Sequence, residues 1–138
     1  MKESQIQSLF GKYLKENPPE RTCVFELKIC KGNSLLFDAV KPHQIVGLQQ
    51  AHNGLYHKIA DMTFGRAGMF GHTLKKPFDC VFIKEAIGYV AICFYKPRKK
   101  KEIYLIPINQ FLKAKQNAGR KSLTEEFAGM YCERKITL

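Results

Sequence analysis

The sequence predicts a single domain of the α/β (α+β) class, with a mixed central β-sheet flanked by helices. Segments with apolar residues at helical spacing and segments in which apolar and polar residues alternate both recur along the chain. Neither an internal repeat nor a low-complexity segment interrupts them. The 138 residues, 45% of them hydrophobic, suffice for one core, so we expect one domain over residues 1–138.

The N-terminal segment predicts a helix and then a hairpin. Residues 2–15 carry apolar side chains on one helical face. The helix ends before Pro18, because proline disfavours helix in itself and in the residue before it. Residues 22–30 alternate as a strand, and Gly32 lies in a turn that leads to a second strand over residues 34–40.

The middle of the chain predicts a second helix, a strand and a long loop. Pro42 suits the first turn of a helix that closes near Gly54. A strand follows over residues 55–62. Residues 63–76 are rich in glycine and basic residues, and we expect a flexible basic loop there, because loops of this length are usually functional or disordered.

The C-terminal half predicts the rest of the sheet. Residues 79–83, 89–95 and 102–106 are strand-like, and a short helix is expected over residues 110–116. The tail, residues 119–138, is weakly patterned, so no strand is assigned to it.

The charge of the chain is the first indication of function. There are 23 lysine and arginine residues against 12 aspartate and glutamate residues, a formal net charge of +11. A polyanionic partner follows, because each neutralised phosphate releases counterions. Charge alone does not separate a nucleic-acid enzyme from a ribosome-associated or merely basic protein.

The cysteine pattern indicates a reducing compartment, and the lack of long apolar runs indicates a protein without membrane contact. The five cysteines include no C-x-x-C pair, so free thiols are expected, and their spacing to the four histidines does not indicate a zinc site. No apolar run is long enough to span a bilayer, and the N-terminus lacks the apolar core of a signal peptide. We therefore expect an intracellular, cytoplasmic protein without membrane contact.

A charged pair interrupts the apolar strand predicted at residues 22–30. Glu26 and Lys28 are two residues apart, so both side chains leave the same face. Such a pair is costly unless it is solvated or used. A carboxylate can hold Mg²⁺, and an ammonium group can orient an attacking water or stabilise charge on a phosphate. The alternative is an ordinary ion pair on a solvated sheet.

A second carboxylate is needed for a magnesium site, and Asp79 is the candidate. It opens a strand that we expect to pair beside residues 22–30, which would place the two carboxylates on adjacent strands. Asp38 or Asp61 is the alternative partner. Asp79 would otherwise be a residue that caps a turn at the start of a strand.

These motifs resemble a known class of nuclease. Glu26-x-Lys28 on a strand, with an aspartate after Pro77 at a strand start, resembles the PD-(D/E)XK nuclease superfamily. The hairpin that follows, the His43-Gln44 pair opening a helix, and the late apolar strands resemble RecU-type Holliday-junction resolvases over roughly residues 25–112. The resemblance implies a restriction-endonuclease-like fold.

The resemblance also implies an activity and partners. The chain would be a structure-selective endonuclease that depends on Mg²⁺ or Mn²⁺, hydrolyses phosphodiester bonds, cuts four-way DNA junctions during recombination and acts as a homodimer. Such an enzyme would be of phage or prokaryotic type. Glu26 and Asp79 would bind the metal, Lys28 would serve the attacking water and Gln44 would support the site. Glu3, on the first helix, would match an acidic residue that many members carry there.

The order of the motifs departs from the family pattern. In the family the aspartate strand precedes the Glu-x-Lys strand, whereas Asp79 follows it here. The favoured explanation is a permuted site, because it keeps a complete set of ligands. The other explanation takes residues 77–79 as the first motif, with Cys93 and Tyr95 at the expected Glu-x-Lys positions and Lys96 one residue further on.

Basic residues in two segments are candidate DNA contacts. They are Arg66, His72, Lys75 and Lys76 in the loop, and Arg98, Lys99 and Lys100 in the turn between the late strands. The loop lacks a P-loop pattern, so no nucleotide cofactor is expected. The alternative function is a non-catalytic nucleic-acid-binding module of the same fold, and an RNA-directed protein ranks last because no RNP-like motif is present.

Overall fold

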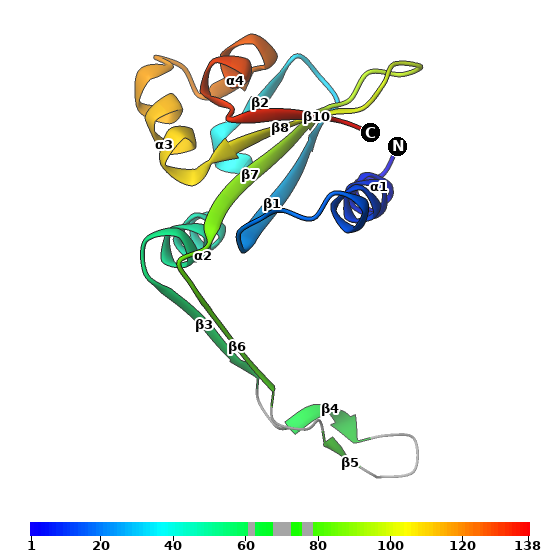
Figure 1. The fold of residues 1–138 in the computed structure, drawn as a ribbon, viewed down its shortest axis with the longest axis vertical. Helices are drawn as coiled ribbons and strands as arrows, with labels where there is room; N and C mark the ends of the chain where they lie inside the picture. The colour runs from blue at the N-terminus through cyan, green and yellow to red at the C-terminus, as the bar shows by residue number, and fades with distance from the viewer. Residues whose placement is uncertain (61–62, 68–72, 76–78) are drawn as a thin grey trace.

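The computed structural model describes the backbone of residues 1–60, 63–67, 73–75 and 79–138 and the side chains of residues 1–59 and 80–138. A central sheet with helices on both faces forms the body of the molecule, and a two-stranded ribbon projects from it (Figure 1). The α/β architecture with a mixed sheet in one small domain is as expected.

The central sheet has the strand order β1-β7-β8-β10. Its strands are β1 (Cys23–Cys30), β7 (Ile87–Phe94), β8 (Glu102–Pro107) and β10 (Arg134–Thr137). Strand β1 runs parallel to β7, whereas β7 with β8 and β8 with β10 are antiparallel. The weakly patterned tail therefore supplies a strand of the main sheet, which the sequence analysis did not assign.

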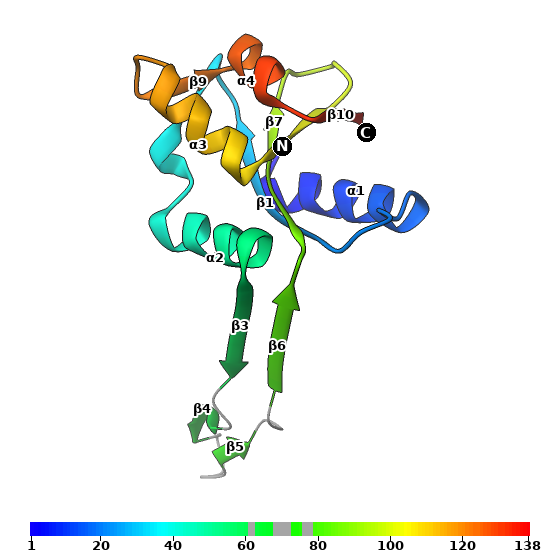
Figure 2. The same cartoon turned by 60° about the vertical axis from the view of Figure 1, so that its left-hand side comes forward.

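Helices cover the two faces of the sheet unequally (Figure 2). Helix α1 (Glu3–Glu16) lies on one face, where its Ile6 and Phe10 are buried. Helices α2 (Pro42–Asn53), α3 (Ile108–Asn117) and α4 (Glu125–Tyr131) pack on the other face. No helix in the described part of the chain is long and apolar enough to cross a membrane.

Strand β7 is apolar throughout because both of its faces are covered. Val90 and Ile92 belong to the cluster under α2 and α3, whereas Ala91 and Cys93 belong to the cluster under α1. A strand buried on both sides loses polar–apolar alternation, as buried strands of parallel pairs commonly do. All five cysteines carry free thiols.

Short elements complete the layer on the α2 side. Strand β2 (Ser34–Leu36) is followed by the 3-10 turn η1 (Phe37–Ala39), so the strand expected over residues 34–40 is shorter than predicted. Strand β2 pairs with β9 (Ser122–Thr124). Thr124 caps α4, because its side-chain oxygen accepts a hydrogen bond from the Phe127 N–H at 3.2 Å.

The ribbon is built from β3 (Leu55–Ala60) and β6 (Asp79–Lys84), which pair antiparallel from Leu55–Lys84 to Ala60–Asp79. Strands β4 (Thr63–Ala67) and β5 (Thr73–Lys75) pair with each other beyond it. The prediction of one loop over residues 63–76 is therefore wrong where these two strands lie. Glycine-rich sequence masked their pairing, since glycine weakens a strand signal.

Helix α2 approaches β7 very closely at Gly88. A Cβ atom on Gly88 would lie 2.7 Å from the carbonyl oxygen of Leu48. Two hydrogen bonds fix the same contact: the Gly88 N–H donates to His52 Nδ1 at 3.2 Å, and the Ala86 N–H donates to the Ala51 carbonyl at 3.1 Å. The C-terminal end of α2 is therefore held against the start of β7.

We expect Gly88→Ala to lower the free energy of unfolding by about 1–3 kcal/mol, because the added methyl group must push α2 away from β7. Urea denaturation measures the change. Gly11→Ala in α1 is the matched control, since nothing lies within 4 Å of its Cβ position. That control is expected to gain up to about 1 kcal/mol from helix propensity. A Gly88→Ala variant as stable as the wild type would contradict the close approach.

Candidate functional site

Glu26 and Lys28 leave the same face of β1, as predicted. They share this face with Val24 and Cys30, which pack into the apolar cluster on the α2 side of the sheet. Their side chains are only partly withdrawn from solvent: 27% of the Glu26 side chain and 16% of the Lys28 side chain are exposed. The pair therefore sits at the border between the core and the surface.

The first turn of α2 reaches this pair. Pro42 occupies the start of the helix, where its missing N–H is not needed. Gln44 links the helix to the strand through both ends of its amide. Its Oε1 accepts from the Lys41 N–H at 2.8 Å, and its Nε2 donates to Glu26 Oε1 at 2.7 Å. The predicted supporting role of Gln44 thus has a geometric basis.

One oxygen of Glu26 receives both protein donors. Lys28 Nζ lies 3.0 Å from Glu26 Oε1, the same atom that accepts from Gln44. Within the described residues, Oε2 accepts no hydrogen bond. The positive end of the α2 dipole further favours a negative charge near this helix start. The arrangement holds a carboxylate in one orientation and leaves one of its oxygens available to a ligand.

Two hollows border Glu26. One lies toward α1 and is lined by Glu3, Gln7 and Phe25 among others, so it brings the predicted acidic residue of α1 to the same hollow as Glu26. The other lies toward α2 and is lined by His43, Gln44 and Tyr56 among others. Gln44 and Lys28 therefore contact the Glu26 carboxylate, whereas Glu3 shares with Glu26 only the lining of the hollow toward α1.

Asp79 is not brought beside Glu26. Its strand, β6, pairs with β3 in a separate sheet, whereas the partner of β1 is β7, with Glu26 opposite Val90. The expected pairing of residues 79–83 with residues 22–30 is wrong. The six residues of β6, at about 3.3 Å each, put Asp79 roughly 16 Å from the root of the ribbon. The side chain of Asp79 lies outside the described residues.

Asp38, one of the two alternative acidic partners, does not join Glu26 either. Asp38 lies in η1 and pairs with Lys115 of α3, with 3.4 Å between Oδ1 and Nζ. Asp61 lies outside the described residues. Within the described part of the chain, no group of three or more histidine, cysteine, aspartate or glutamate side chains is placed to hold a metal ion.

The other explanation of the motif order, with the Glu-x-Lys positions at the end of β7, does not provide a metal site among the described residues. Cys93 is fully buried in the apolar cluster under α1, and burial raises the pKa of its thiol. Lys96 forms an ion pair with Glu125 of α4. The second explanation of the motif order, with Cys93 and Tyr95 in the Glu-x-Lys positions, therefore finds no support.

The predicted DNA contacts are only partly described. Arg66 and Lys75 lie on β4 and β5, but their side chains, like His72 and Lys76, lie outside the described residues. The other predicted contacts form an exposed turn between β7 and β8. They are Arg98, Lys99 and Lys100.

This basic turn stands apart from Glu26. It begins beyond Phe94, whereas Glu26 is opposite Val90 in the middle of β7. Arg98 adopts a positive φ of 60°, which shapes the tight turn. The structure thus places these cations at the end of the strand and does not bring them to the Glu26 cluster.

A polar cluster that the sequence analysis did not assign joins the basic turn to α4. Glu125 accepts hydrogen bonds from Lys96 and, at 3.0 Å, from the Tyr104 hydroxyl. The hydrogen bond from Lys96 holds the pKa of the Glu125 carboxyl below its ordinary value. Burial, followed by the bond to Glu125, raises the pKa of the Tyr104 phenol. This cluster fastens α4 to the sheet.

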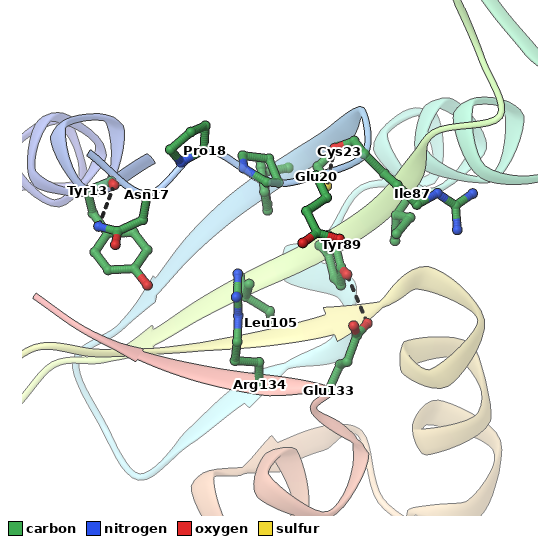
Figure 3. Close-up of a pocket in the computed structure, with 13 residues that line it drawn as sticks. Tyr13, Asn17, Pro18, Glu20, Cys23, Ile87, Tyr89, Leu105, Glu133 and Arg134 are labelled. Carbon is green, nitrogen blue, oxygen red and sulfur yellow. Dashed lines mark hydrogen bonds between the residues drawn. The ribbon is translucent and has the colours of Figure 1, made fainter. Parts of the chain in front are cut away.

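A further hollow opens on the α1 side of the sheet (Figure 3). The Tyr89 hydroxyl donates to Glu133 Oε2 at 2.8 Å there, and Tyr13, Arg21 and Arg134 also line it. Burial raises the pKa of the Tyr89 phenol, so it stays protonated and donates even above its ordinary pKa of 10.0. None of the predicted site residues lines this hollow, and the bond between Tyr89 and Glu133 ties the entry of β10 to β7.

Comparison of the chain with family models, curated proteins and solved structures gives no significant match. The geometry around Glu26 therefore stands on its own.

We expect Glu125→Gln to be less stable than the wild type at pH 7 by about 0.5–1 kcal/mol, a modest value because the ion pair is partly exposed. The lowered pKa means that ionised Glu125 stabilises the fold above the ordinary carboxyl pKa of 4.5. The stability difference should shrink as the pH falls through the lowered pKa. Thermal melting between pH 7 and pH 3 measures it.

Glu126→Gln is the matched control, because Glu126 is the exposed neighbour of Glu125 in the same helical turn. Its effect should be small at every pH. A Glu125→Gln deficit that persists unchanged at pH 3 would show that the ion pair is not its cause.

Proposed function

We propose that this protein is a metal-dependent DNA endonuclease whose centre is Glu26. One observation carries the proposal: the Glu26 carboxylate is held by Gln44 and Lys28 through a single oxygen, at the start of α2 and at the surface. A purely structural ion pair needs no third group to orient the carboxylate. A metal-binding carboxylate benefits from one, because outer hydrogen bonds fix ligand orientation.

The described residues fit a magnesium ion better than a transition metal. Mg²⁺ prefers oxygen ligands, keeps several waters, and is usually bound by one or two carboxylates together with substrate phosphates. Glu26 offers a carboxylate oxygen, and Glu3 lines the same hollow from α1. A bound Mg²⁺ or Mn²⁺ would polarise a phosphate and lower the pKa of a coordinated water.

Lys28 is the residue that we assign to the reacting groups. Its ammonium group lies 3.0 Å from Glu26 Oε1, so a phosphate or water bound at Glu26 would be within its reach. There it can orient the attacking water and stabilise the negative charge that develops on the phosphate. Gln44 is a positioning residue, because among the described residues its side-chain amide hydrogen-bonds to Glu26 and to the backbone of Lys41.

DNA is the proposed substrate because of charge and resemblance together. The net charge of +11 supplies the salt-dependent affinity that a polyanion requires. Specificity for four-way junctions, a role in recombination and a homodimer are the finer part of the proposal, and they rest on the resemblance to RecU-type resolvases. Two symmetric cuts in a junction need two active sites related by a two-fold axis.

A non-catalytic nucleic-acid-binding module is the second candidate. The observation that favours it is that Glu26 and Lys28 already neutralise each other at 3.0 Å. Such a pair is complete without a metal, and the positive charge alone would give affinity for DNA. Metal dependence separates the two candidates, because a pure binder yields no product in magnesium.

We expect Glu26→Gln and Lys28→Ala each to lower cleavage of a synthetic four-way junction by at least about 100-fold, with binding retained, because each removes a group at the reacting centre. Gel analysis of labelled strands in Mg²⁺ and in EDTA measures it, with a linear duplex as the second substrate. Lys113→Ala, an exposed lysine of α3, is the control for lost charge.

Cleavage of the junction alone supports the junction specificity, and cleavage of both substrates leaves a general nuclease. No cleavage by the wild type, with tight and salt-sensitive binding, supports the binding module. Cleavage at the wild-type rate by either variant would remove that residue from the site.

A magnesium titration tests which carboxylate assists Glu26. We expect Glu3→Gln to raise the Mg²⁺ concentration needed for half-maximal cleavage by roughly 10-fold or more, because the change removes a carboxylate from the hollow that it shares with Glu26. Asp79→Asn is the comparison. If Asp79→Asn abolishes cleavage and Glu3→Gln does not, Asp79 is the partner, and the far end of β6 must reach Glu26 by a movement of the ribbon or from a second copy.

A further inference from the structure

The hollow on the α2 side of Glu26 has the composition of a small-ligand site. Its volume is about 330 Å³, at the lower end of the roughly 300–1,000 Å³ typical of such sites. Strand β1, helix α2 and the root of β3 border it. The residues that line it are Val24, Phe25, Glu26, His43, Gln44, Gly47, Leu48 and Tyr56.

An aromatic ring lies next to a glycine in the lining of this hollow. Tyr56 is half-buried at the root of the ribbon, where it pairs with Ile83. A Cβ atom on Gly47 would lie 3.6 Å from Tyr56 Cε2. Gly47 stands inside a helix, where glycine costs about 1 kcal/mol relative to alanine. A larger side chain at this position would occupy the space beside the Tyr56 ring.

The polar groups of the hollow are those of the Glu26 cluster. Glu26 and Gln44 line it together with the exposed His43 of the first turn of α2, and Val24 and Leu48 supply apolar surface. An apolar pocket with an aromatic wall and a few convergent polar groups suits a flat heterocycle. Because Glu26 lines the same hollow, such a ring would lie next to the group that we assign to the metal.

We propose that this hollow takes one unstacked nucleobase of the DNA substrate, stacked on Tyr56. The proposal deepens the proposed function and rests on it, because the base would belong to the strand whose phosphate is bound at Glu26. Stacking on an aromatic ring tolerates every base, so the hollow selects DNA by structure and not by sequence.

This base pocket explains how one domain can favour branched DNA. Removing a base from an intact duplex costs a few kcal/mol, and the cost is least where a base is unpaired or mismatched. Bases at a branch point or in a single strand are therefore the ones that enter most easily. A linear duplex lacks such a base and should bind through charge alone.

The test measures equilibrium binding in EDTA, where no cleavage occurs. The probes are a fluorescent four-way junction and the same junction with one abasic nucleotide at the branch point, moved through successive positions. We expect the wild type to bind at least one abasic junction about 5- to 100-fold more weakly than the intact junction, the range expected for one stacked base. Tyr56→Phe should behave as the wild type.

Two variants remove the pocket in different ways. Tyr56→Ala should bind the intact junction as weakly as the wild type binds the abasic one, and should no longer distinguish the two probes. Gly47→Leu should give the same result by filling the hollow, and its helix propensity is higher than that of glycine. Gly129→Leu in α4 is the control, because Gly129 is an exposed helical glycine whose Cβ position lies at the ordinary distance of 3.8 Å from Tyr104 Cε1 and it lines neither hollow at Glu26.

The outcomes of these measurements support or overturn the base pocket. Equal binding of every abasic junction and the intact one by the wild type, or discrimination retained in both Tyr56→Ala and Gly47→Leu, overturns the base pocket. Loss of discrimination in these two variants alone supports it. If discrimination follows the expected pattern but no cleavage appears in Mg²⁺, the nuclease proposal fails while the base pocket stands.

Discussion

The parallel pairing of β1 with β7 is the constraint on which the rest of the structure depends. Parallel neighbours cannot be joined by a tight turn, so the chain must cross over between them. Here the crossover carries β2, α2 and the ribbon (Figure 1). The contact at Gly88 then fixes the C-terminal end of α2 against the start of β7. The opposite end of the helix is therefore directed to the middle of β1.

This constraint turns an ordinary ion pair into an ordered site. Lys28 alone could approach Glu26 in several rotamers, as exposed pairs do. Gln44 adds a neutral donor that is itself fixed to the backbone of Lys41. The carboxylate is thus oriented by one residue of the strand and one residue of the helix. Because Gln44 belongs to α2, the packing of α2 on β7 also determines where Gln44 lies in the site. Gly47 belongs to the same helix as Gln44, so the proposed base pocket and the proposed metal ligand share one support.

Local patterns in the sequence predicted most of the elements, and the pairing of strands was the part that they could not predict. The common face of Glu26 and Lys28 follows from the two-residue period of a strand, and Pro42 marked the start of α2 correctly. The predicted pairing of the Asp79 strand with β1 was wrong because alternation does not say which neighbour a strand pairs with. The antiparallel partner β3 is closer along the chain than β1. Strand β10 was missed because the tail is short and weakly patterned. The place of Tyr56 beside Gly47 could not be predicted from local patterns, since it depends on a tertiary contact.

The asymmetry of the Glu26 carboxylate favours use over simple stability. A buried or half-buried carboxylate gains most when its donors are spread over both oxygens, yet Gln44 and Lys28 both address Oε1. Oε2 therefore accepts no hydrogen bond from the described residues and is left to solvent. Solvent-facing oxygen, a fixed orientation and an adjacent ammonium group are what a hydrated hard cation and a phosphate require together. A lysine that stays bound to the other oxygen need not be displaced when such a cation arrives, so the ion pair and the proposed metal site are compatible in one arrangement.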